Sequence, residues 1–170
     1  MAELTVYTFP DPVLKQVAQP VVDFNDKLKV LADDMAEAMY ENIGIGLAAP
    51  QVGVPLRMFV ADLSYKGPDE DSPKAPVAYC NPVLKNMKGE IALEEGCLSV
   101  PEYRAEVQRF DELTLDYQDL NGKHQSVNAH GLFAVCIQHE TDHLNGKLFI
   151  DHLPPLRRKM IEKKLRKLAR

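Results

Sequence analysis

The pattern His-Glu-X-X-His at residues 139–143 is the feature that most restricts the fold of this chain. Residues four apart lie one turn apart on the same face of an α-helix, so the imidazoles of His139 and His143 can both reach one cation. Glu140 projects close to them at a different angle, which suits a group that handles the proton of a metal-activated water better than a metal ligand. The pattern therefore predicts a helix with a metal site on one face, the alternative being that two histidines and a glutamate coincide on a solvated helix face.

The residues around this pattern favour a helix at 131–144. Leu132, Val135 and Cys136 recur at helical spacing with the two histidines, so this helix is partly buried, and Gly146 stands where a C-terminal cap belongs. Buried histidines need hydrogen-bond partners. The candidates for that role are Glu95, Gln138 and Asp142.

Two further helices and a set of short strands are predicted around this helix. Apolar residues at spacings of three and four indicate an amphipathic helix at 25–40 with Asn25 as its N-cap, and a second one begins at about Leu156. Strands are predicted at 57–63, 77–79, 87–93, 105–108 and 113–117, and the last runs into Asn121-Gly122, the dipeptide of a type I′ hairpin turn.

This order of elements predicts the α+β class, because helices stand at the two ends and the strands cluster between them. We expect a single domain in which antiparallel strands pack around the central helix at 131–144, with one helix near the N-terminus and an amphipathic helix at the C-terminus. Within it, residues 1–153 form the catalytic part. Residues 154–170 form a basic helix that belongs to the same domain or serves as a docking tail.

Composition limits where such a protein works. The 170 residues are 45% hydrophobic and 26% charged, which is ordinary for a globular domain. No apolar run is long enough to span a bilayer, and the N-terminal residues show no secretory signal, so we expect a cytoplasmic protein. The three cysteines, Cys80, Cys97 and Cys136, are too few for a disulfide framework.

A catalytic metal site usually has three protein ligands and one position left for water. Downstream of the two histidines, the chain offers Asp151 and His152 and then a basic segment poorly suited to hold a cation. Upstream, Gly96 removes bulk beside Cys97, which would bind as a thiolate. The residues alone favour Cys97 as the third ligand without excluding the downstream pair.

Three segments resemble the signature segments of peptide deformylases, and they occur in the same order. They are Gly-Ile-Gly-Leu-Ala-Ala-Pro-Gln at 44–51, Glu-Gly-Cys-Leu-Ser at 95–99 and Gln-His-Glu-Thr-Asp-His-Leu at 138–144. The likeness covers most of the chain, from Asp-Pro-Val-Leu at 11–14 to Gly-Lys-Leu-Phe at 146–149. The chain is therefore expected to hydrolyse the N-formyl group from the N-terminal formyl-methionine of nascent polypeptides.

The resemblance also implies a role for each matching residue. Cys97, His139 and His143 would bind the metal, and Glu140 would act as general base and then general acid. The side-chain amide of Gln51 and the backbone N–H of Leu98 would stabilise the oxyanion. Fe²⁺ is the expected metal, one per chain, with Zn²⁺, Ni²⁺ and Co²⁺ as substitutes.

Five residues are expected to contact the peptide substrate. Glycines allow a substrate backbone to approach closely, although a loop that needs positive φ would also contain them. Ile45 and Val135 would line the pocket for the methionine side chain, and both could equally belong to the core. The expected substrate-binding residues are Gly44, Ile45, Gly46, Gly96 and Val135.

The C-terminal segment carries a charge that the rest of the chain lacks. Residues 157–170 hold eight bases and one acid, a net +7, which leaves −12 for the preceding residues of a chain with net charge −5. A stripe of Leu156, Met160, Ile161, Leu165 and Leu168 makes this helix amphipathic. It either packs on the domain with a solvated basic face or docks on ribosomal RNA. A membrane partner is not expected, and a monomer is favoured.

Two other functions fit part of the sequence. An ordinary His-Glu-X-X-His metallopeptidase would cleave internal peptide bonds, but it gives Cys97 and Gln51 no task. A metal-stabilised RNA-binding module would use the basic helix and would not need Glu140.

Overall fold

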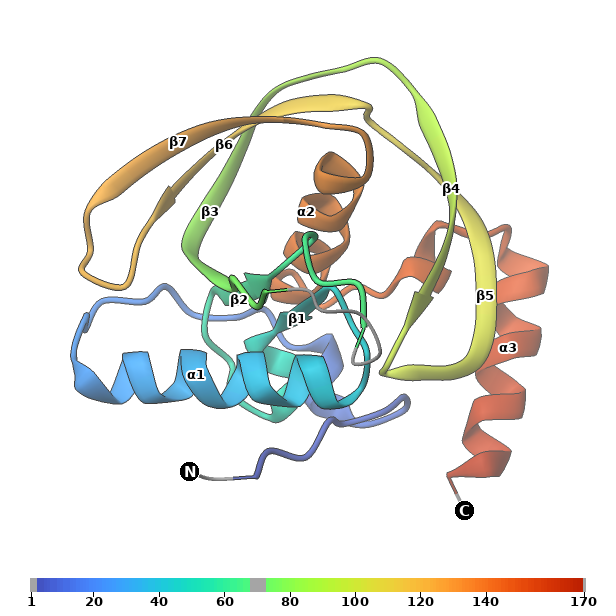
Figure 1. The fold of residues 1–170 in the computed structure, drawn as a ribbon. Helices are drawn as coiled ribbons and strands as arrows, with labels where there is room; N and C mark the ends of the chain where they lie inside the picture. The colour runs from blue at the N-terminus through green and yellow to red at the C-terminus, as the bar shows by residue number, and fades with distance from the viewer. Residues whose placement is uncertain (1–2, 68–72, 170) are drawn as a thin grey trace.

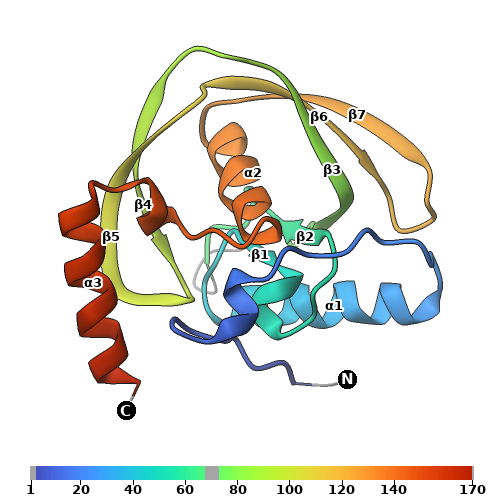
Figure 2. The same ribbon diagram turned by 180° about the vertical axis from the view of Figure 1, so that it is seen from behind.

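Helix α2 (Gly131–Leu144) lies at the centre of the fold, as the sequence predicts. The computed structural model describes residues 3–67 and 73–169. In Figure 1, strands arch over α2 on both sides, and helix α1 (Asp26–Glu41) lies beneath it. Helix α3 (Pro155–Leu168) lies outside this arch, and the view from behind in Figure 2 shows it against β5 (Val100–Arg109).

The strands form two antiparallel sheets. The larger has the order β1-β2-β3-β6-β7, and the smaller pairs β4 with β5. In the larger sheet β1 forms one edge, so only one side of β1 is paired within the sheet. The bounds not yet given are β1 (Gly46–Ala48), β2 (Met58–Ala61), β3 (Val77–Lys88), β4 (Ile91–Cys97), β6 (Glu112–Gln118) and β7 (His124–His130). The predicted single α+β domain is confirmed.

The buried apolar residues form three clusters. One packs α2 residues such as Ile137 and Leu144 against the large sheet. A second packs α1 residues such as Met35 and Met39 against β1 and β2. The third joins β5 to α3 and to the short 3₁₀ helix η3 (Phe149–His152). The two other short helices are η1 (Pro12–Lys15) and η2 (Ala49–Val52).

The start of α1 follows from its cap. The side chain of Asn25 accepts a hydrogen bond from the Leu28 N–H at 3.1 Å, which satisfies one of the free donors at the helix start. This confirms the predicted N-cap, and α1 ends one residue later than expected.

The prediction of a separate strand at 87–93 is wrong. Residues 77–88 form one long strand, and Gly89 with φ +73° turns the chain into β4. The register of β3 against β6 shifts twice, and Asn81 and Asn86 on β3 have positive φ. Such irregularities break the alternation of apolar and polar residues by which a long strand is recognised.

The hairpin between β6 and β7 is confirmed, but its turn is of another type. A type I′ turn needs positive φ at both central residues, whereas here only Gly122 of the pair Asn121-Gly122 has it, at +81°. The Gly122 N–H donates to the Asp119 carbonyl at 2.9 Å, and the Asp119 N–H donates to the Lys123 carbonyl at 3.0 Å. The turn is therefore longer, with glycine at its left-handed position.

The predicted apolar stripe of the C-terminal helix is correct only in part. Ile161 and Leu165 are buried against β5, whereas Leu156, Met160 and Leu168 are exposed. Two buried residues one turn apart suffice to attach α3 to the domain. Within the described residues, none of the helices is long and apolar enough to cross a bilayer.

Asp62, which directly follows β2, connects β2 to α1 and to the loop after β2 through hydrogen bonds. Its carboxylate accepts hydrogen bonds from the hydroxyls of Tyr40 and Ser64 at 2.5 and 2.6 Å, and from the Ala75 N–H at 2.8 Å. Burial alone would raise the pKa of Asp62, but these hydrogen bonds outweigh it and hold the pKa at about 2. The Asp62 N–H also donates to the Ile45 carbonyl at 2.9 Å, so this residue supports the wall of the cavity described below.

We expect Asp62→Asn to remove a stabilisation that depends on pH. A carboxyl whose pKa is lowered by folding stabilises the protein fully above its unfolded pKa, and this stability is lost as the pH falls towards the folded pKa. The difference in unfolding free energy between the wild type and Asp62→Asn should therefore shrink by about 1 kcal/mol from pH 7 to pH 3. Urea unfolding of both proteins at both pH values measures it. A difference that stays constant would show that folding does not lower the pKa of Asp62.

Candidate active site

Three potential metal ligands converge where the small sheet meets α2. Cys97 ends β4, and His139 and His143 lie one turn apart on α2. Their ligand atoms all lie within 4.8 Å of one another, and the Cys97 Sγ is 3.4 Å from the His143 Nε2. A thiolate with two imidazoles is a usual donor set for a divalent transition metal. This group could therefore hold one metal ion.

The electrostatics of the group favour the thiolate. Burial by itself would raise the pKa of Cys97, but His143 and His139 lower it well below that of a free thiol. A thiolate is the form of cysteine that binds metals.

Behind the ligands lies a chain of buried charges. The Nδ1 of His139 is 2.9 Å from the Glu95 Oε1, so its Nε2 is left for the metal. Glu95 accepts two hydrogen bonds from Arg109, at 2.9 and 2.8 Å, and Arg109 donates a third to Asp142 at 2.7 Å. His152 lies 2.8 Å from Asp142 at the outer end.

This row of charged side chains keeps Glu95 ionised although its carboxylate is buried. Burial would raise the pKa of Glu95, but the hydrogen bonds and charges of Arg109 and His139 lower it below its usual value. The side chains of Arg109 and Glu95 are 4% and 6% exposed, so their charges stabilise each other in a buried place, and Asp142 is a second partner of Arg109.

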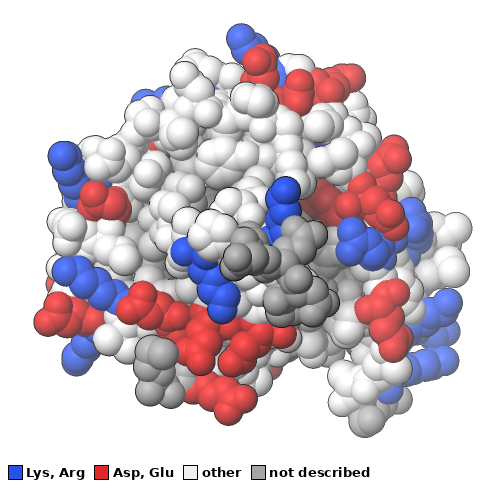
Figure 3. Space-filling view, in the orientation of Figure 1, with Lys and Arg blue, Asp and Glu red and all other residues white. Residues whose placement is uncertain are grey.

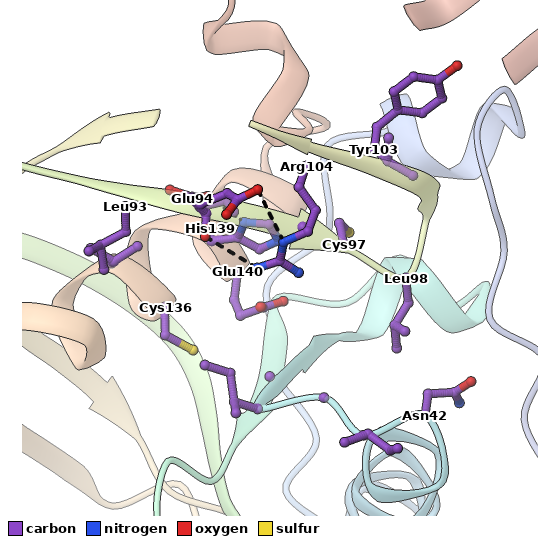
Figure 4. A pocket seen from close by; sticks show the side chains of 18 of the residues that line it. Asn42, Leu93, Glu94, Cys97, Leu98, Tyr103, Arg104, Cys136, His139 and Glu140 are labelled. Carbon is purple, nitrogen blue, oxygen red and sulfur yellow. Dashed lines mark hydrogen bonds and ion pairs between the residues drawn. The ribbon is translucent and has the colours of Figure 1, made fainter. Parts of the chain in front are cut away.

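A cavity of about 600 Å³ opens beside the ligands. Figure 4 shows Cys97, His139 and Glu140 together in it, with Arg104 on the β-hairpin above and Asn42 at the end of α1. Every residue predicted for the site lines this cavity except His143, which is buried behind it. The lining includes Gly44, Ile45, Gly46, Gln51, Gly96, Cys97, Leu98, Val135, His139 and Glu140.

Glu140 is buried beside the ligands. Its side chain contacts the cavity, the residue is 4% exposed, and its Oε1 has no hydrogen-bond partner among the described residues. Burial raises the pKa of Glu140, and the charges of Cys97 and Glu95 add to this, against the opposing effect of the two histidines. Gly46 makes room for this carboxylate, because a Cβ at Gly46 would lie 2.8 Å from the Glu140 Oε2.

Hydrogen bonds to both the oxygen and the nitrogen of its side-chain amide hold Gln51 in place. Its Oε1 accepts the Ala48 N–H at 3.0 Å, and its Nε2 donates to the Ser99 Oγ at 3.1 Å and lies 3.4 Å from the Cys97 Sγ. The Ser99 hydroxyl in turn donates to the Tyr7 carbonyl at 2.7 Å. The amide therefore presents its N–H groups next to the metal ligands in one orientation.

Comparison with known proteins gives the family. The model of the family described as polypeptide deformylase matches residues 3–159. A peptide deformylase of Brucella suis is 52% identical over 94% of this chain and 90% of its own length. The chain belongs to the polypeptide deformylase family. It is therefore an enzyme of the hydrolase class, as the resemblance predicted.

Solved structures agree with this family over the whole fold. A peptide deformylase of Legionella pneumophila is 42% identical with a TM-score of 0.88, and the match covers 99% of this chain and 96% of that one. A peptide deformylase of Ehrlichia chaffeensis, solved in complex with actinonin, is 35% identical with a TM-score of 0.91, covering 100% and 99%.

The residues of this deformylase fit a bound metal. In the part of the chain described, the Oε1 of Glu140 is a buried polar atom without a partner. Buried polar atoms rarely stay unpaired. A metal ion with its water would give Glu140 a partner, and the orientation of His139 by Glu95 is typical of a metal-binding histidine.

Sequence reasoning did not separate the supports of the ligands from other polar residues. The side-chain hydrogen bonds of Gln138 within the described residues go to the backbone of Phe110 and Ala134 and not to the histidines, and Asp142 binds Arg109 and His152. Asp151 caps η3 through the Leu148 N–H and lies outside the ligand group.

Arg109 and Ser99 were missed. Arg109 had a signal, because Ala105, Val107 and Arg109 alternate on the buried face of β5. An arginine on a buried face requires a carboxylate.

Proposed function

We propose that this deformylase hydrolyses the formyl group from the N-terminal formyl-methionine of nascent polypeptides. The observation that carries the proposal is the grouping of Cys97, His139 and His143 next to the buried carboxylate of Glu140, in a cavity that Gln51 also lines. The peptide deformylases to which the chain is similar support this substrate.

Each residue has a chemical task in this proposal. A metal held by Cys97, His139 and His143 would make a water molecule acidic enough to lose its proton near pH 7. Glu140 accepts that proton and later gives it to the departing amine. The Gln51 amide and the Leu98 N–H donate to the oxygen on which negative charge develops, each contributing about 3–4 kcal/mol to the lowering of the barrier.

The peptide would lie along the free edge of β1. Gly46 begins this edge strand, and Gly44, Ile45 and Gly46 line the same wall of the cavity. An extended peptide can pair with such an edge through its backbone. The methionine side chain would then enter the apolar part of the cavity at Ile45 and Val135, and Gly96 on the facing hairpin leaves space for the substrate.

We propose Fe²⁺ as the native metal, with Zn²⁺, Ni²⁺ and Co²⁺ as substitutes. The donor set is compatible with each of them, and the resemblance to the family favours iron. We further propose that the protein works as a cytoplasmic monomer.

Formate release from a formyl-Met tripeptide tests the function. The protein should be loaded with Fe²⁺ under reductant and without oxygen, and acetyl-Met tripeptide serves as the control substrate. We expect release from the formyl peptide only. If the metal-loaded protein released no formate but cleaved internal peptide bonds, the metallopeptidase function would replace this one.

The basic helix α3 is proposed to bind ribosomal RNA. Its basic side chains lie at the lower right in Figure 3, while the acidic side chains of α1 lie at the lower left. We keep residues 1–153 as the catalytic part and 154–170 as the basic helix. Because Ile161 and Leu165 are buried, charge removal tests this role better than deletion.

Replacing Lys163, Lys164 and Lys167 together by Gln should weaken ribosome binding and reduce its dependence on salt. Each phosphate contact that is lost lowers the slope of log K against log salt by about 1. Sedimentation with ribosomes at several salt concentrations measures the slope, and formyl-peptide turnover should not change. The control replaces Lys27, Lys29 and Lys88, which are exposed on other elements. Equal effects of both triple variants would show that α3 is not a specific docking element.

A further inference from the structure

The end of α1 contains an isoleucine in a backbone conformation that favours glycine. Ile43 has φ +56°, and it is the only β-branched residue with positive φ among the described residues. The Ile43 N–H donates to the Tyr40 carbonyl at 3.0 Å, and the Gly44 N–H donates to the Met39 carbonyl at 2.9 Å. This pair of bonds is the Schellman ending of a helix, in which Ile43 occupies the left-handed position. For a β-branched residue this conformation is a genuine outlier.

The fold gives no reason for this isoleucine. Its side chain is 69% exposed and belongs to none of the three apolar clusters. Gly44, the next residue, has an ordinary φ, and a Cβ there would find its nearest neighbours at 3.5–3.7 Å, which is normal packing distance. The chain therefore has a side chain where the backbone favours glycine, and a glycine where the backbone would accept a side chain.

Both residues lie on the wall that the substrate is proposed to follow. Ile43, Gly44, Ile45 and Gly46 line the cavity in sequence. Gly46 marks the catalytic end, because its Cβ position is 2.8 Å from the Glu140 Oε2. In Figure 4, Asn42, which precedes Ile43, lies on the side of the cavity away from His139. Residues 46 to 43 thus run from the catalytic end of the cavity outwards.

The spacing indicates which part of a peptide reaches Ile43. Ile43 lies three residues before Gly46, and three residues of extended chain span at most about 10 Å. A peptide whose formyl end lies at Glu140 and which follows the wall residue by residue would therefore bring its third residue to Ile43. The peptide leaves the catalytic end in its N-to-C direction. Residues 46 to 43 of the wall leave the same end in the C-to-N direction, so the two segments are antiparallel. A glycine at 44 lets the two backbones approach.

We infer that Ile43 is a specificity-determining residue that gives the enzyme a preference for an apolar side chain at the third residue of the formylated peptide. This inference rests on the proposed deformylase function. The exposed isoleucine offers apolar surface to that side chain, and each methylene that leaves water on binding improves binding by about fourfold. Conformational strain at a binding wall is expected where the side chain has a task there.

The test compares two substrates that differ only at the third residue. The iron-loaded wild type should have a kcat/KM about fivefold higher for formyl-Met-Ala-Leu than for formyl-Met-Ala-Ser. In Ile43→Gly the ratio should fall to near 1, and in Ile43→Val it should stay close to the wild-type value. Val22→Gly is the matched control, because Val22 is an exposed β-branched residue that does not line the cavity, and its ratio should equal that of the wild type.

A second measurement separates this role from a purely structural one. The Tm of Ile43→Gly should be no lower than that of the wild type, because glycine suits positive φ. An unchanged substrate ratio in Ile43→Gly, or a wild-type ratio near 1, would overturn the inference while leaving the deformylase function intact. If the wild type released no formate even from formyl-Met-Ala, the proposed function would fail and the inference with it.

Discussion

Replacing Glu140 by Gln should lower kcat/KM for formyl-peptide hydrolysis by about 10²–10⁴-fold while the metal content stays unchanged. Glutamine has the shape of glutamate but cannot accept a proton. The Oε1 of Glu140 is buried and has no hydrogen-bond partner in the described part of the chain, so the substitution breaks no hydrogen bond of that atom. Formate release measures the rate, and elemental analysis of the purified protein measures the metal.

The matched control is Glu94→Gln. Glu94 lines the same cavity, but its side chain is exposed and its contact with Arg104 is a loose ion pair of 3.7 Å. Such a pair contributes little, so turnover should change less than threefold. A Glu140→Gln protein that kept more than a tenth of the wild-type rate would contradict the assignment of Glu140 as general base. Loss of the metal from that protein would instead assign Glu140 to the ligands.

Replacing Arg109 by Met should destabilise the protein by about 3–5 kcal/mol and weaken metal binding by about 10–100-fold. Without its guanidinium, the buried Glu95 loses both hydrogen bonds from Arg109, and Asp142 loses one. The carboxylate that orients His139 then lacks a cation to keep it ionised. Urea unfolding of the metal-loaded protein measures the first effect, and competition with a chelator measures the second.

Lys88→Met provides the comparison for this prediction. Lys88 pairs with Glu112 at 3.7 Å on the surface, with both side chains exposed, so its loss should change the unfolding free energy by about 0.5 kcal/mol or less. If Arg109→Met also changed stability by less than about 1 kcal/mol, Glu95 would not be ionised in the folded protein. In that case the account of how His139 is oriented would be wrong.

The helices and the pairing of His139 with His143 on one helix face could be predicted because their signals are local. Asn25 caps the helix that follows it, and the spacing of His139 and His143 has meaning only in a helix. The assignment of Cys97 needed the family resemblance, because nothing in its own segment says which part of the chain it meets. The ligand group joins residues that lie far apart in sequence.

Other features could not be predicted because they depend on contacts between distant segments. The long β3 was divided into short strands, since its bulges interrupt the alternation on which the prediction relied. Leu156, Met160 and Leu168 were placed in one apolar stripe with Ile161 and Leu165 by spacing alone, but only Ile161 and Leu165 are buried, against β5. Ile43 gave no signal in the sequence, because its unusual backbone is visible only in three dimensions.

The placement of the ligands on two different units has a consequence for how the protein holds together. Cys97 belongs to the two-stranded sheet, while both histidines belong to the helix packed on the five-stranded sheet. A metal ion bound to all three would therefore act as a cross-link that closes a loop containing β5, β6 and β7. Like a disulfide, such a link restricts the unfolded chain, and because only the folded chain assembles the site, the free energy of metal binding is added to that of folding. In this protein the metal ion would therefore stabilise the fold as well as take part in the reaction.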